Sequence, residues 1–182
     1  MGYTHYFKTS GKSLTKEQAD GVIKHVAKVF KQHKDIIQRE YDNTAPPVLD
    51  AALNLSGKLS IGIFLNGKGE YGHETFAVHT GDDSRGFCKT SRKPYDIVVS
   101  KVLLILKHYL GDDMELGSDG FSTYQPSGKA YKVGDKVLLK NLSGTWGKAA
   151  RAINAQLKTN FHFIVDDVYG KDGCYFSYKL KQ

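Results

Sequence analysis

The chain has only two cysteines and four prolines among its 182 residues, and it lacks any long apolar run. Two cysteines, Cys88 and Cys174, are too few for a disulfide framework or a four-thiolate zinc site. The richest apolar stretch, residues 97–106, is interrupted by Lys101 and falls short of the roughly 18 residues that a membrane span requires. No basic segment followed by an apolar one opens the chain, so no secretory signal is predicted. We therefore expect a cytoplasmic protein without membrane contact.

Residues that bind metals or act as nucleophiles are present, but no spacing joins them. The seven histidines form neither a helical HExxH pair nor a cysteine–histidine zinc pattern. The Gly-Lys-Gly of residues 67–69 lacks the strand–loop–helix context of a phosphate-binding loop. We therefore predict no metal, no cofactor and no catalytic residue, and we expect a protein that is not an enzyme.

The positive charge is concentrated near the C-terminus. The chain carries 26 lysines and arginines against 19 acidic residues, a net charge of +7. Residues 127–182 hold 10 of the cations and 4 of the acids, whereas residues 1–126 hold 16 and 15. This division indicates a nearly neutral body with a basic appendage. The appendage either binds a polyanion or serves as a solubilising surface.

Two helices and several strands are predicted in the first two thirds of the chain. An aromatic and β-branched segment, residues 3–7, is typical of a strand. A capping box, with Thr15 and Gln18, precedes apolar residues at spacings of three and four, which predicts a helix over residues 15–39. Further along, the pattern predicts a strand over residues 58–65 with an antiparallel partner at 74–79. A basic turn over 85–93 is expected next. A largely buried helix over 94–110 should follow and end at Gly111.

The last third has a different pattern. Short β-prone segments separated by glycine-bearing turns occur at residues 131–140, 161–165 and 174–180. Their opening, Lys-Val-Gly-Asp-Lys-Val, is similar to the start of SH3-like barrels. The predicted fold class is therefore α+β, with a mixed, mainly antiparallel sheet and two main helices, followed by a small SH3-like β-barrel. The expected division is an α+β head domain (1–122), a linker (123–128) and a basic SH3-like β domain (129–182).

The most distinctive local feature is the segment from Phe87 to Asp96. Three cations, Lys89, Arg92 and Lys93, precede a predicted helix N-terminus, where backbone N–H groups and the helix dipole favour an anion. Tyr95 offers a ring for stacking. We predict an anion- or partner-binding site here, and its remaining candidates are His5 and Tyr6 of the N-terminal strand. Alternatively, these cations are exposed loop charges at a helix cap, and His5 packs in the core.

These segments resemble a group of small uncharacterised phage and mobile-element proteins. The resemblance covers roughly residues 1–120 and rests on an opening Gly-Tyr-Thr-His-Tyr, a Phe-Cys-Lys-Thr-x-Arg-Lys-Pro-Tyr-Asp string and a Ser-Asp-Gly. The matching positions are Gly2, Tyr3, Thr4, His5, Tyr6, Asn66, Gly67, Phe87, Cys88, Lys89, Thr90, Arg92, Lys93, Pro94, Tyr95, Asp96, Ser118, Asp119 and Gly120. The chain departs from the pattern at Phe7, where the group often has tryptophan. It also departs in its basic tail, residues 129–182.

The resemblance implies a phage protein that acts in the cytoplasm of the bacterial host. Together with the length and the basic tail, it makes the chain similar to anti-CRISPR proteins directed at type II effector nucleases. The expected function is host-defence antagonism: an inhibitor that binds the CRISPR effector ribonucleoprotein, double-stranded DNA, or both, and blocks target recognition or cleavage.

Two alternatives stay open. The head can instead bind or hydrolyse a nucleotide-based immune signal, with His5 as general acid or base. The chain can also be a non-specific nucleic-acid-binding phage protein. For DNA binding, the tail supplies nine candidate phosphate contacts. These are Lys129, Lys132, Lys136, Lys140, Lys148, Arg151, Lys158, Lys171 and Lys179.

Overall fold

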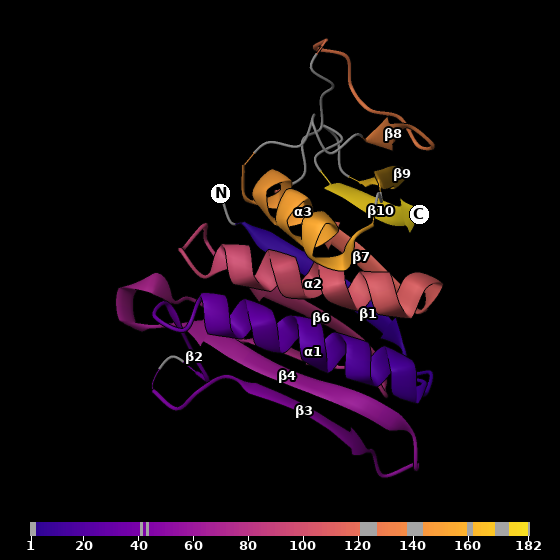
Figure 1. Cartoon of the computed structure of the whole chain (residues 1–182). Coiled ribbons are helices and arrows are strands. Elements are labelled where there is room, and N and C mark those ends of the chain that lie inside the picture. The colour runs from indigo at the N-terminus through magenta and orange to yellow at the C-terminus, as the bar shows by residue number, and fades with distance from the viewer. Residues whose placement is uncertain are drawn as a thin grey trace.

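The structure of the protein is a computed structural model that describes residues 3–40, 42, 44–120, 127–137, 144–159, 162–169 and 175–181. It is an α+β fold of three helices and antiparallel sheets, as predicted for the class. The helices form a row with α2 in the middle, and in the view of Figure 1 some strands lie behind this row and others lie below α1. The helices are α1 (Lys16–Gln32), α2 (Asp96–Leu110) and α3 (Gly144–Leu157).

Helix α1 begins at the predicted capping box. The Thr15 hydroxyl accepts the Gln18 backbone N–H at 3.2 Å, and the Gln18 side-chain oxygen accepts the Thr15 N–H at 2.9 Å. The expected extension to residue 39 is wrong, because the helix ends at Gln32. Ile37 is instead drawn into the core by β2 (Ile37–Gln38), which pairs with β4, so strand pairing overrides the helical spacing of the apolar residues.

Helix α2 is the most buried helix, as its nearly uniform apolar sequence predicted. Eleven of its fifteen residues are buried, which places it at the centre of the helix row. It begins at Asp96, two residues later than expected, and Gly111 ends it with a φ of 57°, a conformation that favours glycine. Among the described residues there are also two short 3₁₀ turns, η1 (Gly69–Tyr71) and η2 (Gly111–Asp113).

A six-stranded antiparallel sheet, in the order β6-β1-β7-β10-β9-β8, carries the N-terminal strand near one edge. Its first three strands are β1 (Thr4–Ser10), β6 (Asp83–Lys89) and β7 (Met114–Ser118). The basic turn expected over residues 85–93 is therefore wrong in its first half. Residues up to Lys89 pair with β1 along its whole length, and only the following residues turn toward α2. Long-range pairing with β1, which no local pattern shows, makes this segment a strand.

A second, four-stranded sheet is built around β4. The predicted antiparallel pair is confirmed, since β4 pairs with β5 from Gly62 opposite His79 to Leu65 opposite Phe76. An unpredicted strand, β3, lies on the other side of β4. The bounds of this group are β3 (Val48–Leu53), β4 (Leu59–Gly67) and β5 (Phe76–His79).

The tail differs from the small barrel that the sequence predicted. Its described strands close no barrel among themselves but extend the six-stranded sheet, because β10 pairs with β7 at Phe176 opposite Ser118 and Ser177 opposite Gly117. The tail also contains α3, which packs on α2. The tail strands are β8 (Lys136–Val137), β9 (His162–Tyr169) and β10 (Tyr175–Lys181).

The division into residues 1–122 and 129–182 stays a prediction. Strands of both segments belong to one six-stranded sheet, and helices of both segments pack in one row. Within the described ranges, no helix is both long and apolar enough to cross a membrane.

Candidate functional site

His5 lies at the centre of a fully enclosed polar cluster. Its side chain projects from β1 toward the helices, where Nε2 lies 2.6 Å from Asp96 Oδ1 and Nδ1 lies 2.8 Å from Ser118 Oγ. The Thr90 hydroxyl donates to the same Asp96 oxygen at 2.6 Å. Exposed fractions are 0% for His5 and 2% for Asp96. The cluster thus joins β1, the start of α2 and the end of β7.

The hydrogen bonds at Ser118 fix the direction of this network. Ser118 Oγ accepts the indole N–H of Trp146 and the backbone N–H of Gly120, both at 3.0 Å. With both lone pairs used, the hydroxyl proton points to His5 Nδ1, which must accept it. His5 therefore carries its own proton on Nε2 and donates it to the Asp96 carboxylate. The donor and acceptor roles of Ser118 and His5 in this chain of hydrogen bonds are thereby defined.

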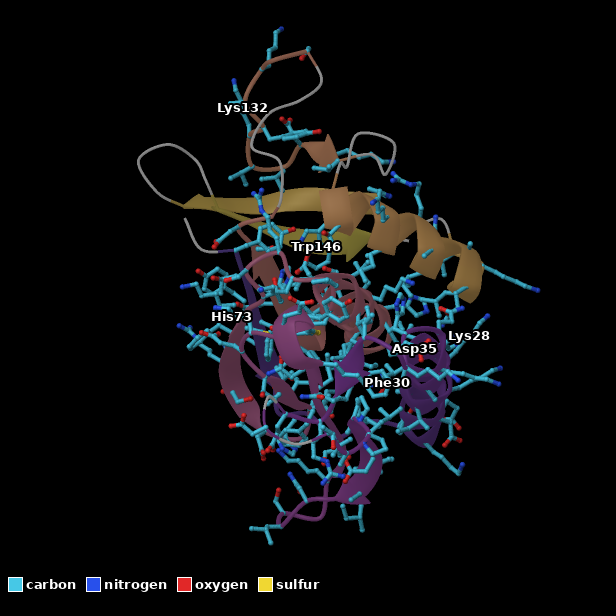
Figure 2. The ribbon with its side chains drawn as sticks, turned by 90° about the vertical axis from the view of Figure 1, so that its left-hand side faces the viewer. Lys28, Phe30, Asp35, His73, Lys132 and Trp146 are labelled. Atoms are coloured by element: carbon cyan, nitrogen blue, oxygen red, sulfur yellow. The ribbon has the colours of Figure 1, made fainter. Side chains whose placement is uncertain are left out.

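Aromatic rings close the cluster from two sides. The rings of Tyr3 and Trp146 both meet the His5 ring edge to face, at centroid distances of 5.4 and 5.2 Å. Above Tyr3 lies the Arg92 guanidinium, 5.0 Å from the ring centroid. Burial raises the pKa of the Tyr3 phenol well above its usual range. Figure 2 shows Trp146 beneath α3, where the tail meets the head. His5 thus connects elements of the core, and its ring has no solvent-facing surface.

The turn between β6 and α2 has an unusual backbone. Ser91 and Arg92 have φ values of 50° and 57°, in the left-handed region that side chains rarely adopt. This conformation turns backbone donors inward: the N–H groups of Thr90 and Ser91 both bond the Tyr3 carbonyl, at 3.0 and 3.3 Å. The N–H of Lys93 bonds the Thr90 carbonyl at 3.0 Å. The N–H groups of Thr90, Ser91 and Lys93 are therefore not available to an anion at this turn.

The predicted anion-binding residues do not gather at one surface. Tyr95 is fully buried, and its hydroxyl donates to the Glu74 carbonyl at 2.6 Å, so its ring has no free face for stacking. Burial also raises the pKa of the Tyr95 phenol far above its ordinary value. Arg92 is exposed at the turn, whereas Tyr6 lies on the opposite face of the sheet and is 42% exposed. Lys89 and Lys93 are half-buried.

The tail cations fall into three groups. Lys140 and Lys171 lie outside the described residues, and Lys179 lies on β10. The other six predicted contacts are exposed: Lys129, Lys132, Lys136, Lys148, Arg151 and Lys158. Figure 2 shows Lys132 at the outer end of the tail, far from Lys28 on α1. The six exposed cations come from different segments: Lys136 lies on β8, Lys148 and Arg151 lie on α3, and the other three lie outside helices and strands.

One subset shares the outer face of the helix row. Lys148 and Arg151 are three residues apart on α3, so they point in similar directions, and α3 contains no acidic residue. Across α2, the helix α1 exposes Lys24, Lys28 and Lys31, and its acidic residues are confined to its first turns. The two flanking helices thus present cations on the same side of the molecule.

Histidines at the seam between the helices report this positive environment. Gln156 of α3 donates to the His25 carbonyl at 3.1 Å, which links α3 to α1. The pKa of His25 is lowered, first by burial and then by the nearby charges of Lys24 and Lys28. On α2, Lys101 lies 3.0 Å from His33, and burial lowers the pKa of both.

The comparisons with known proteins supply no relative that could help to interpret this site. No protein-family model matches the chain, and no curated protein or solved structure is significantly similar to it. Sequence reasoning did not single out Trp146, Ser118 and Thr90 as members of one cluster with His5. The one available signal for Trp146 was its helical spacing to Ala149, Ala150 and Ile153, all of which are buried.

Proposed function

We propose that this protein is a non-enzymatic, non-specific double-stranded DNA-binding protein that inhibits a type II CRISPR effector nuclease. The observation that supports the DNA-binding part is the outer face of the helix row. There α1 and α3 expose Lys24, Lys28, Lys148 and Arg151, with no acidic residue on α3 and none on α1 after Asp20.

This face suits a duplex better than a compact anion. Helix α1 has 17 residues, and at about 1.5 Å per residue it extends for about 25 Å. Cations spread over such a length match the regular phosphates of a duplex, and each neutralised phosphate releases counterions and adds affinity. The face contributes no exposed row of asparagine, glutamine or arginine to read bases, so binding without sequence preference is expected.

Inhibition follows from competition for DNA. A type II effector must first read a short element in duplex DNA before its guide pairs with the target. A protein that covers the duplex, or that occupies the effector surface where the duplex docks, stops the search at that step. This role is the one that the resemblance of residues 1–120 implies together with the length and the basic tail, and it needs no catalytic residue. The enclosure of His5 and Tyr95 favours it over hydrolysis of a nucleotide signal.

Binding of the full chain to a labelled duplex at two salt concentrations tests the DNA-binding part. The double variant Lys148→Gln/Arg151→Gln should weaken binding and reduce the log–log salt slope by about 1.8, since each lost contact changes it by about 0.9. The matched control is Lys12→Gln/Lys58→Gln, which removes two cations that lie outside the three helices, where Lys12 pairs with Asp113 and Lys58 donates to the Gly11 carbonyl. Equal losses in both variants would reject the helix face as the site.

A cleavage assay tests the inhibitory part. The protein is added to a guide-loaded type II effector before its DNA substrate, and unrelated duplex DNA is added as competitor. Loss of inhibition with competitor indicates DNA as the bound partner. Inhibition that resists competitor indicates the effector ribonucleoprotein. Full cleavage at a large excess of the protein would reject this role while leaving DNA binding intact.

A further inference from the structure

The face of the sheet opposite the helices carries a pair of exposed aromatic side chains. Tyr6 on β1 lies directly across from Phe87 on β6 in the strand register. Phe87 is 65% exposed and Tyr6 is 42% exposed, although large apolar side chains are usually covered. Side chains opposite each other on neighbouring strands have Cβ atoms about 5 Å apart, so the two rings start from adjacent positions on the same face.

Glycines position this pair from both sides of the sheet. On the far side of β1, the residue opposite Tyr6 is Gly117 of β7, which has no side chain to cover the Tyr6 ring. Beside Phe87, Gly86 faces the core and lies against the Phe7 ring, so that a Cβ at Gly86 would collide with Phe7. The strand therefore keeps Phe7 inside while presenting Phe87 outside.

Cations flank the two rings along the strands. Two residues further along the register, on the same face, Lys8 lies opposite Arg85, and two residues in the other direction Lys89 lies opposite Thr4. Arg85 is exposed, and Lys8 and Lys89 are half-buried. Three of the four nearest same-face positions on these two strands are therefore basic.

Two acidic groups lie near these cations. Glu115 of β7 approaches Lys8 to 3.7 Å, and the Glu74 carboxylate accepts the backbone N–H of Lys89 at 2.7 Å. The ion pair of Lys8 is solvent-exposed, with Glu115 70% exposed, and such pairs are weak. Arg85 lies directly opposite Lys8 on β6, so positive charge predominates beside the rings.

We propose that this face, defined by Tyr6, Phe87, Lys8, Arg85 and Lys89, is a binding site for single-stranded nucleic acid. Unpaired bases stack on exposed aromatic rings whatever their sequence, and adjacent cations hold the phosphates. A duplex keeps its bases stacked inside and offers the rings nothing to bind. This site is separate from the helix face and uses a different chemistry, so it does not depend on duplex binding.

The test is fluorescence anisotropy of the full-length protein with two labelled probes, an oligo-dT and an oligo-rU of about 15 nucleotides. Phe87→Ala should weaken single-strand binding about 5- to 150-fold, because stacking on one ring typically contributes 1–3 kcal/mol per base. Phe87→Trp should restore it. Duplex affinity should change less than about twofold in both variants. The ratio of the two probe affinities shows whether DNA or RNA is preferred, since only RNA offers 2′-hydroxyls.

Tyr71→Ala is the matched control, because Tyr71 is 40% exposed but lies on η1 rather than on β1 or β6. Arg85→Gln should reduce the single-strand salt slope by about 0.7, the value for one phosphate contact. The proposal is overturned if neither probe binds at low salt, or if Tyr71→Ala and Phe87→Ala act equally. It is also overturned if Lys148→Gln/Arg151→Gln reduces single-strand binding as much as Phe87→Ala does.

Discussion

The indole N–H of Trp146 donates a hydrogen bond to the Ser118 hydroxyl at 3.0 Å, and both side chains are almost completely buried. Trp146 lies on α3 in the tail, whereas Ser118 ends β7 in the head. Ser118 in turn donates to His5, and His5 donates to Asp96. A residue of the tail thus completes the polar network of the head. The packing of α3 therefore contributes to the stability of the N-terminal strand.

Trp146→Phe should destabilise the protein. Phenylalanine keeps an aromatic ring against His5 but removes the N–H, which leaves one lone pair of the Ser118 oxygen without its donor. A buried polar group that loses its partner typically costs about 1–3 kcal/mol. Urea unfolding followed by far-UV circular dichroism measures this loss, because the variant lacks the only tryptophan of the chain. An unchanged midpoint would mean that the indole bond adds nothing to stability.

Asp96→Asn should destabilise the protein, and the size of the loss should depend on whether the Thr90 hydroxyl is present. Asp96 Oδ1 receives both His5 and Thr90, while the buried Oδ2 has no hydrogen-bond partner within the described part of the chain. An amide weakens the bond to His5 and buries a donor without an acceptor, with an expected loss of about 1–3 kcal/mol. In a cycle with Thr90→Val, the double variant should lose less than the sum of the single losses. Strict additivity would contradict the shared network.

Stability should fall as the pH is lowered from about 7. Burial lowers the pKa of His33 below its ordinary value, followed by the charge of Lys101. The unfolded chain therefore binds protons at a higher pH than the folded chain, so acidification favours unfolding until the lowered pKa is passed. His25 and His108 shift in the same direction. Denaturant unfolding across this pH range measures the effect.

The variant His33→Gln tests how much of this pH dependence of stability comes from His33. Glutamine does not titrate, and its side-chain oxygen can still accept the Lys101 ammonium that now contacts His33. The stability of this variant should change less with pH than that of the parent protein. Identical pH slopes in the two proteins would place the effect on other groups.

Cys88 should not react with thiol reagents in the folded protein. Its side chain is fully buried, and burial raises the pKa of the thiol to about 12, so almost no thiolate exists near neutral pH. The measurement requires Cys174→Ser, which leaves Cys88 as the only thiol. Labelling should then proceed only through unfolding and accelerate with denaturant. Rapid labelling of the native protein would show that the β6 region opens locally.

Local sequence patterns determined the start of α1, the end of α2 and the pairing of β4 with β5. The two helix ends depend on neighbours within a few residues, through the reciprocal bonds of Thr15 and Gln18 and the backbone freedom of Gly111. The strand pair follows from the alternation along β4 and from a second strand nearby in the sequence, with paired residues 11 to 17 positions apart. Lys148 and Arg151 were predicted as phosphate contacts of a β-rich tail, whereas the structure places both on α3, a helix that was not predicted.

Only the tertiary structure decided the rest. It ended α1 before Ile37 because β4 offered a strand partner, and it turned residues 83–89 into β6 because β1 lies beside them. It placed β10 against β7 instead of closing a barrel. His5, Asp96, Ser118 and Trp146 are far apart in sequence, and no spacing connects them. Burial brings them together, because a polar group removed from water must find its hydrogen-bond partner wherever the folded chain supplies one.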